Sequence, residues 1–284
     1  MSTGAAAAAS IGIVAGGGTL PGAVAHAIEQ KGQRPVLFGI KGFCDPATLA
    51  GRSHHWVAIG QLGRFYRLMR AENCRDVIFI GSLVRPALRE LRLDLETLRA
   101  MPALIAAFRG GDDHLLTSFS RLIEAQGFEV RGVGDVAPQL TVPPGAMTQA
   151  VPDTAALDDI ARGRAVLSAI SDFDVGQAVV VIDGHVVAIE DIEGTDALLA
   201  RIARLRAERR IRAPAGRGVL VKAPKSRQDL RFDMPALGPQ TIAGVEKAQL
   251  GGIAAVAGQT LVAEPQALVA AAERAGLFVV GVSR

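Results

Sequence analysis

Short apolar runs alternate with amphipathic stretches along the first part of the chain. Four runs have the length and β-branched composition of buried strands, at residues 11–15, 34–40, 55–59 and 76–80. Apolar residues at helical spacing follow the first run and also fill residues 62–71. Because strands that alternate with helices form parallel sheets covered by helices, this half predicts an α/β domain with a parallel sheet.

Two more helices and a last strand follow in this half. The pattern predicts a helix over residues 93–108, which Pro102 bends or breaks because proline removes a main-chain hydrogen bond. A second helix begins near Asp113, and residues 128–133 have the pattern of a strand. The α/β pattern therefore continues as far as residue 133.

A proline-rich, uncharged stretch divides the chain. Residues 137–152 contain four prolines, carry no charge and follow neither helical nor strand periodicity, which is typical of a linker. We therefore expect a flexible tail at 1–10, an N-terminal domain at 11–136 and a C-terminal domain at 153–284.

The second half combines a hairpin with further helices and strands. Residues 177–182 and 185–189 are apolar runs joined by Asp183-Gly184, a pair that supplies the positive φ angles of a tight turn. The other predicted helices lie at 154–170, 196–210, 241–250 and 265–275. The other predicted strands lie at 218–222, near Ile253, near Leu261 and at 277–282. This order predicts a mixed α/β domain.

Composition and charge narrow the class of protein. A chain of 284 residues with 49% hydrophobic and 21% charged residues can bury a large core. The net charge of +3 is too small to indicate nucleic-acid binding without local clustering. Cys44 and Cys74 cannot form a disulfide framework, which fits a reducing compartment. The sequence also predicts neither a signal peptide nor a transmembrane helix.

A glycine-rich loop joins the first strand to the first helix. Its candidate binding residues are Gly17, Gly18, Thr19 and Leu20. Main-chain N–H groups at such a turn favour an anion, although a turn needed only for packing has the same composition. A dinucleotide fingerprint would need glycine where Pro21 stands, and the second strand ends without a carboxylate for a ribose. A nicotinamide-dependent oxidoreductase is therefore an alternative that the sequence disfavours.

Two other loops of this half carry candidate substrate-binding residues. Ser82, Leu83 and Arg85 follow the fourth strand, at the carboxyl edge where open α/β sheets bind ligands. A merely solvated loop is the other interpretation. Gly111 and Asp112 precede a helix, where the aspartate either caps the helix or contacts a ligand.

Two motifs flank the predicted hairpin: DVGQ before its first strand and EGTD after its second. Thr195 can cap the next helix, while Glu193 and Asp196 either offer oxygen ligands to Mg²⁺ or complement the helix N-terminus. The candidate binding residues of the two motifs are Gln177, Gly194, Thr195 and Asp196.

The segment 222–235 has the richest mixture of charges. From Gln228 onward apolar and polar residues alternate, so an extended chain would place its charges on one face. Cations that neutralise phosphate oxygens, next to acids that hold Mg²⁺ or orient water, suit pyrophosphate chemistry. An edge strand with solvated ion pairs is the alternative. The candidate catalytic residues are Lys222, Asp229, Arg231 and Asp233, with Lys225 as a substrate ligand.

Seven arginines cluster between residues 201 and 217. A solvated helix face is the default interpretation of such a cluster. The alternative is that it holds the chain near anionic lipid head groups without inserting.

Together these motifs resemble one family. In chain order they are AGGGTLP, GSLVRP, GGDD, DVGQ, EGTD and KAPKSRQDLRFDMPALGPQTI. They are similar to the motifs of the LpxI-type UDP-2,3-diacylglucosamine pyrophosphatases of lipid A biosynthesis. The resemblance extends from Ile11 to Val282.

The resemblance implies a Rossmann-like N-terminal domain and an α/β C-terminal catalytic domain, with a substrate cleft between them. It also implies Mg²⁺-dependent hydrolysis of UDP-2,3-diacylglucosamine to UMP and 2,3-diacylglucosamine 1-phosphate, with water attacking the sugar-side phosphorus. The family's essential acid falls on Asp233, which with Glu193 and Asp196 forms the expected metal set.

The expected location is the cytoplasm, with peripheral contact at the inner face of the inner membrane, and the expected assembly is a homodimer. No nucleic-acid partner is expected. A non-catalytic carrier of nucleotides or lipids is an alternative from another class, since it would keep an apolar chamber without needing the acids.

Overall fold

The computed structural model describes residues 10–83, 92–108, 112–226 and 228–283. The chain divides into two compact units that do not follow the sequence order throughout. Unit 1 comprises residues 1–137 together with Arg231–Asp233, and unit 2 comprises Pro138–Leu230 and Met234–Arg284. A three-residue segment from the second half of the chain is therefore part of the first unit.

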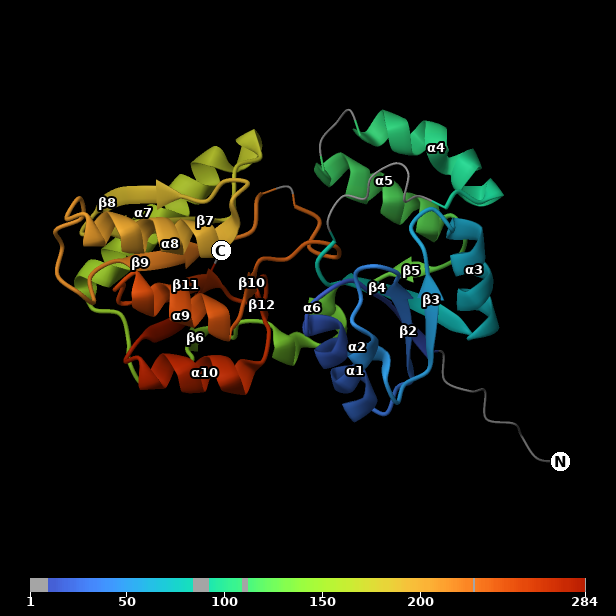
Figure 1. The fold of residues 1–284 in the computed structure, drawn as a ribbon, viewed down its shortest axis with the longest axis horizontal. Helices are drawn as coiled ribbons and strands as arrows, with labels where there is room; N and C mark the ends of the chain where they lie inside the picture. Colours follow the sequence, from blue (N-terminus) through green and yellow to red (C-terminus); the bar gives the residue numbers. More distant parts are fainter. Residues whose placement is uncertain (1–9, 84–91, 109–111, 227, 284) are drawn as a thin grey trace. The chain divides into compact units, whose positions relative to one another are not determined.

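Unit 1 is built on a five-stranded parallel sheet (Figure 1). Its strands are β1 (Ser10–Ala15), β2 (Pro35–Ile40), β3 (His54–Val57), β4 (Cys74–Ile80) and β5 (Glu129–Val130), in the order β3-β2-β1-β4-β5. Its helices are α1 (Leu20–Gln30), α2 (Pro46–Leu49), α3 (Leu62–Ala71), α4 (Leu95–Phe108), α5 (Asp112–Glu124) and α6 (Val133–Val136). This arrangement confirms the predicted Rossmann-like parallel sheet.

The core of unit 1 explains why the apolar runs predicted its strands. Every residue of β1 and β2 is buried, as expected for central strands covered on both faces. Helix α3 lies so close that a Cβ on Gly12 would come 2.6 Å from the sulfur of Met69. Helix α4 continues through Pro102 instead of ending there.

Unit 2 contains a mixed six-stranded sheet. Its strands are β6 (Gly145–Ala146), β7 (Ala178–Ile182), β8 (His185–Ile189), β9 (Val219–Lys222), β11 (Gly252–Val256) and β13 (Phe278–Val282), in the order β6-β13-β11-β9-β7-β8. Strands β9, β11 and β13 are parallel, whereas β7 runs antiparallel to β8 and β9. The predicted hairpin and the mixed α/β class of this half are confirmed.

Helices cover both faces of this sheet. Ile160 and Leu167 of α7 (Thr154–Ile170) pack on Val179 and Val181 of β7. The intervening strand residues face the opposite side, where they pack against the remaining helices. Those helices are α8 (Gly194–Ala207), α9 (Pro239–Lys247) and α10 (Pro265–Arg274). Alternate residues of one strand therefore serve two separate layers.

Short elements complete unit 2. They are the 3₁₀ helices η2 (Pro138–Leu140) and η3 (Ser171–Phe173), and the parallel pair β10 (Ala236–Leu237) and β12 (Leu261–Val262). The stretch 137–152, predicted as a linker, holds η2 and also β6, which pairs antiparallel with β13. None of the helices among the described residues is long and apolar enough to cross a membrane.

Candidate functional site

In unit 1 the predicted binding loops meet at the carboxyl ends of β1 and β4. Strand β1 is connected through α1 to β2, which is its neighbour on one side within the sheet. Strand β4 is its neighbour on the other side. This is the topological switch point at which open α/β sheets bind ligands. The main chains of Gly17 and Ser82 donate to each other's carbonyl oxygens, at 2.9 and 3.0 Å, so the two loops form one surface.

The glycines of these loops have separate physical reasons. A Cβ on Gly16 would lie 2.7 Å from the Ser82 carbonyl oxygen, and one on Gly81 would lie 2.7 Å from that of Gly17. These glycines are therefore needed for close packing of the loops. Gly18 differs, because its φ is +89° and a Cβ there would meet nothing within 4 Å. The packing interpretation therefore applies to Gly16 and Gly81, whereas anion binding at this loop stays a prediction.

The segment Arg231–Asp233 is attached to unit 1 by an aromatic and an ionic anchor. The ring of Phe232 packs against Phe79 of β4 and Phe119 of α5, with centroid distances of 5.1 and 6.3 Å. The Arg231 guanidinium donates to Oε1 of Glu124 at 2.8 Å. These two contacts anchor the two residues that directly precede Asp233, whose side chain is exposed.

The extended conformation predicted from Gln228 onward is wrong. Residues Leu230–Phe232 form a turn, so Asp229, Arg231 and Asp233 do not share one face of a strand. The alternation of apolar and polar residues arises instead because Phe232 packs in unit 1 while its charged neighbours face other groups. Arg231, predicted as catalytic, binds helix α5.

In unit 2 a buried polar cluster lies at the carboxyl end of β9. Lys222, the last residue of β9, is only 7% exposed, and its Nζ donates to Thr195 Oγ1 at 2.7 Å. The Thr195 hydroxyl donates in turn to Oε1 of Glu190 at 2.7 Å. Glu190 is 8% exposed, so a buried cation and a buried carboxylate are joined through one hydroxyl group.

The same carboxylate holds the residue before β7. Oε2 of Glu190 accepts a hydrogen bond from the main-chain N–H of Gln177 at 2.8 Å. Three predicted binding or catalytic residues, Gln177, Thr195 and Lys222, are therefore brought together around Glu190. The sequence motifs alone do not distinguish Glu190 from its neighbouring acids.

Lys225 is engaged in a different way. Its ammonium forms an ion pair with Asp174 of the DVGQ motif, and its main-chain N–H donates to Oε1 of Gln228 at 2.9 Å. The main-chain N–H of Ser226 donates to Ser171 Oγ at 2.5 Å. These contacts tie the loop after β9 to η3 and the residue that follows it.

The predicted metal ligands occupy dissimilar surroundings. Glu193 forms an ion pair with Arg201 at 2.7 Å, whereas Asp196 lies exposed in the first turn of α8. Gly194, between them, has a φ of +77° at the start of this helix. Within the described parts of the chain, no three His, Cys, Asp or Glu side chains are grouped closely enough to hold a metal ion.

Several predicted binding residues of unit 1 lie outside the described residues or at the ends of described elements. Arg85 and Gly111 lie outside the described residues, and Asp112 begins α5 without a described side chain. Leu83 is 51% exposed beyond the bridge that involves Ser82. Thr19 and Leu20 stand at the beginning of α1.

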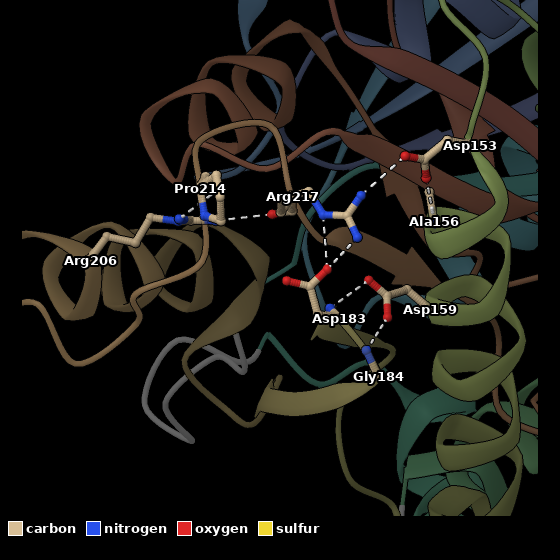
Figure 2. Close-up of polar contacts among 8 residues, drawn as sticks. All are labelled: Asp153, Ala156, Asp159, Asp183, Gly184, Arg206, Pro214 and Arg217. Atoms are coloured by element: carbon tan, nitrogen blue, oxygen red, sulfur yellow. Dashed lines mark hydrogen bonds and ion pairs between the residues drawn. The ribbon is translucent and has the colours of Figure 1, made fainter.

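The opposite end of the same unit 2 strands carries a second ionic cluster (Figure 2). Arg217 precedes β9 and binds Asp183 of the hairpin turn at 2.5 and 2.8 Å and Asp153 at 3.1 Å. Asp159 of α7 accepts from the main-chain N–H groups of Asp183 and Gly184, at 3.0 and 2.6 Å. These groups hold the hairpin turn against α7 and the start of β9.

Two hollows lie at this second end. One, of about 950 Å³, is bordered by α7, the hairpin turn and Arg217. The other, of about 400 Å³, lies beside the amino ends of β9, β11 and β13. Neither is lined by a predicted site residue. The first hollow is lined by Arg162 and Arg217, but the Arg217 guanidinium is engaged by Asp183 and Asp153. We place the candidate site at the carboxyl strand ends, because the residues predicted from the motifs are brought together there.

Comparison with known proteins agrees with the motifs of the sequence. Residues 10–140 match the LpxI N-terminal domain, and residues 143–280 match the LpxI C-terminal domain. The chain belongs to the LpxI family. It is 39% identical, over 96% of its length and 97% of the relative's, to the UDP-2,3-diacylglucosamine pyrophosphatase LpxI of Caulobacter vibrioides.

The LpxI family domains and the structural units divide the chain differently at one place. The match to the C-terminal domain includes residues 231–233, which pack in unit 1. Asp233, which the LpxI resemblance implies is the essential acid, therefore lies in the segment 231–233 that packs in unit 1.

Proposed function

We propose that this chain hydrolyses the pyrophosphate of UDP-2,3-diacylglucosamine to UMP and 2,3-diacylglucosamine 1-phosphate, a step of lipid A biosynthesis. The nearly full-length similarity to an LpxI pyrophosphatase supports this activity. The structural observation that carries the proposal is Lys222, a buried ammonium fixed by a hydroxyl at the carboxyl end of a strand. Such a cation suits the negative charge that develops on phosphate oxygens.

The reaction proceeds by attack of water on the sugar-side phosphorus. A bond forms between the water oxygen and this phosphorus, and the bond from the phosphorus to the bridging oxygen breaks. The bridging oxygen leaves with UMP. Asp233 orients the water or binds Mg²⁺, a role supported by its exposed carboxylate directly after two anchored residues, Arg231 and Phe232.

The donor chemistry of Asp233 fits Mg²⁺. This ion is usually bound through one or two carboxylates together with substrate phosphates and waters, and it does not need a cage of protein ligands. When bound, it neutralises charge on the phosphate oxygens. Asp196 remains a second candidate ligand, whereas Glu193 suits this role less because Arg201 already binds it.

The other charged residues have distinct proposed roles. Lys222 and Thr195 contact the phosphates, with Gln177 beside them. Arg231 anchors the segment that carries Asp233 through its bond to Glu124, so its proposed role is to position this acid. Asp229 is a second acid on the same loop. In unit 1 the surface around Gly18, Thr19 and Ser82 binds an anionic part of the substrate.

Peripheral contact with the inner membrane surface is part of the proposal, but its location changes. Three of the seven clustered arginines bind groups of the protein: Arg201 donates to the Ile189 carbonyl and Arg206 to those of Ala213 and Arg217, at 2.6–2.9 Å, and Arg217 forms an ion pair with Asp183. The other four, Arg204, Arg209, Arg210 and Arg212, are exposed. Burial lowers the pKa of Arg206. The cluster therefore offers only part of its charge to a lipid surface, and we propose an apolar stripe as the main contact.

Helix α4 offers an apolar stripe. Leu95, Leu98 and Ile105 lie on one side of the helix and are 62%, 51% and 50% exposed. Pro102 lies in the same stripe and is also exposed. A diacylated substrate resides in a membrane leaflet, so this stripe is the proposed contact at the cytoplasmic face.

The membrane contact has its own test. Leu98→Glu should reduce co-sedimentation with vesicles of phosphatidylethanolamine and phosphatidylglycerol, because it places a charge in the apolar stripe. Leu157→Glu is the matched control, since Leu157 lies on α7 and is 52% exposed. Equal binding by the two variants would contradict the assignment to α4.

An oxidoreductase and a non-catalytic carrier are the two alternative functions, and a homodimer is the expected assembly. The LpxI family assignment favours a hydrolase over a nicotinamide-dependent oxidoreductase. A non-catalytic carrier would bind the same substrate without releasing UMP. The homodimer stays a prediction.

The test of the proposed function is release of UMP from UDP-2,3-diacylglucosamine in the presence of Mg²⁺. Wild-type protein should release UMP, and EDTA should stop the release. Asp233→Asn should lower kcat/KM by at least about a hundredfold, because the carboxylate is lost where water or metal is held.

Asp158→Asn, an exposed acid on α7, is the matched control and should retain activity. Binding of the substrate without UMP release by wild-type protein would indicate the carrier. Wild-type turnover by Asp233→Asn with an unchanged Mg²⁺ requirement would remove Asp233 from the site.

A further inference from the structure

We infer that Glu190 is a positioning residue whose buried carboxylate fixes the Thr195 hydroxyl and, through it, the Lys222 ammonium. The inference rests on the proposed function, because it concerns the cation that contacts the phosphates. Glu190 follows β8 directly and stands only five residues before Thr195. It is one of four acids in a run of seven residues, and burial sets it apart from the other three.

The carboxylate of Glu190 is locked in one orientation. Its Oε1 accepts from the Thr195 hydroxyl at 2.7 Å and its Oε2 from the Gln177 N–H at 2.8 Å. Its own main chain bonds to Gly176 and Ala178, at 3.1 and 2.8 Å. A Cβ on Gly176 would lie 2.4 Å from the Glu190 carbonyl oxygen, so only glycine permits this approach. Both ends of the residue are therefore fixed.

This orientation sets the direction of the hydrogen bonds. A hydroxyl group has a single hydrogen, and that of Thr195 is donated to the Glu190 carboxylate. Its lone pairs consequently accept from Lys222 Nζ, at 2.7 Å. Without the carboxylate, the hydroxyl is free to rotate and donate elsewhere. Glu190 thereby makes Thr195 an acceptor for the lysine.

The same carboxylate balances the buried charge. Lys222 is 7% exposed and Glu190 is 8% exposed, so both are largely removed from water. A buried ammonium without a compensating charge is costly and tends to lose its proton or its position. One intervening hydroxyl keeps the carboxylate close enough to stabilise the cation.

A second buried carboxylate shows what a purely structural arrangement looks like. Asp159 is 2% exposed and uses both oxygens on the main-chain N–H groups of one turn. Glu190 uses one oxygen in that way, on Gln177, and the other on the hydroxyl that holds Lys222. This difference assigns Glu190 a role in the site beyond holding the hairpin.

A double-mutant cycle tests the inference. Glu190→Gln keeps the size of the side chain but replaces one acceptor oxygen with an NH₂ group, and it should lower kcat/KM on the order of 10- to 100-fold. In a Lys222→Met background, Glu190→Gln should lower kcat/KM less than about threefold, because the lysine through which Glu190 acts on the phosphate is already absent. Asp191→Asn, on the exposed neighbouring acid, is the matched control and should retain activity.

Two results of the cycle would overturn the role. One is activity of Glu190→Gln equal to that of Asp191→Asn. The other is a Glu190→Gln loss of the same size in the wild-type and Lys222→Met backgrounds, since independent structural effects multiply.

A spectroscopic readout separates this inference from the proposed reaction. In ¹⁵N-lysine-labelled protein, the Lys222 Nζ signal is the one absent from Lys222→Met. Glu190→Gln should shift this signal and speed its hydrogen exchange, while Asp191→Asn should leave both unchanged. This result would support the hydrogen-bond relay even if wild-type protein released no UMP. Absence of UMP release would refute only the proposed reaction. An unchanged signal would overturn the relay.

Glu190→Asp serves if the glutamine variant does not fold. It keeps the charge and withdraws the carboxylate by one methylene group, so the Lys222 signal should shift and kcat/KM should fall. An unshifted signal with wild-type activity would contradict the role of Glu190.

Discussion

The two ends of strands β7, β8 and β9 carry similar charges in opposite settings. At the carboxyl end of β9, Glu190 and Lys222 are 8% and 7% exposed and are linked through Thr195. At the amino end, the side chains of Arg217 and Asp183 are 34% and 44% exposed in a direct ion pair. Figure 2 shows this second end, where the partners come from the hairpin turn, α7 and the loop before β9.

The difference in burial separates a cluster that belongs to the candidate site from one that only stabilises the fold. Exposed ion pairs gain little, because water and salt screen them. Buried polar groups are costly unless every partner is fixed, so they are expected where position matters to chemistry. The buried carboxylate Asp159 shows that burial alone is insufficient, because its partners are only main-chain N–H groups. The presence of a buried cation distinguishes the carboxyl end.

The largest effect should come from Lys222→Met. Removal of a cation that faces the developing phosphate charge should lower kcat/KM by about 10² to 10³. The matched change at the other end, Arg217→Met, should leave kcat/KM within about twofold of wild type. UMP release measured side by side gives the comparison. Equal losses at the two ends would remove the distinction between them.

The next effect should be on stability. Asp159→Asn leaves one main-chain N–H of the hairpin turn facing an NH₂ group in a buried place, which should cost about 1–3 kcal/mol. The melting temperature should fall by about 2–4 °C for each kcal/mol. The kcat/KM of the folded fraction should remain that of wild type. A loss of activity without a loss of stability would place Asp159 in the site instead.

The sequence predicted the regular elements well and the long-range contacts poorly. The predicted bounds of α3, α7 and β8 coincide with those observed, because each combines clear periodicity with a definite beginning or end. The docking of Phe232 on Phe79 and Phe119 could not be predicted in this way, since its partners lie more than a hundred residues away. Local alternation was interpreted as a strand, whereas the packing produces a turn.

For the candidate site, residue types were predicted more readily than their connections. The motifs predict Gln177, Thr195 and Lys222 as site residues, and these three do meet. They do not distinguish Glu190 from the neighbouring acids. The hairpin contained a usable signal: with Val179 opposite Ile189, residue 190 continues the ladder beside Ala178. This ladder position brings Glu190 next to Ala178 and to the main-chain N–H of Gln177.

A smaller effect is expected for Arg217→Gln on stability. The ion pairs of Arg217 are exposed, so the melting temperature should fall less than in Asp159→Asn. The difference from wild type should shrink in 1 M NaCl, where the screening length is about 3 Å. A loss that persists in high salt would show that Arg217 acts by packing and not by charge.

The smallest effect should appear in the pH dependence of unit 1. Hydrogen bonds from His55 and Arg34 hold the pKa of Glu72 below its ordinary 4.5. Because the pKa of Glu72 is lower in the folded protein than in the unfolded chain, the carboxylate stabilises the fold fully above pH 4.5. This stabilisation is lost as the pH falls through the pKa of the folded protein. Glu72→Gln should therefore flatten the decrease of melting temperature below this pH. An unchanged slope would show that the contact does not contribute.

The most direct test of the central claim is hydrolysis of UDP-2,3-diacylglucosamine by the wild-type chain in water enriched in ¹⁸O, followed by ³¹P NMR and mass spectrometry. The account predicts UMP without the label and 2,3-diacylglucosamine 1-phosphate with one labelled oxygen, because water attacks the sugar-side phosphorus. Label in UMP would contradict that direction of attack, and the absence of both products would contradict the proposed function itself.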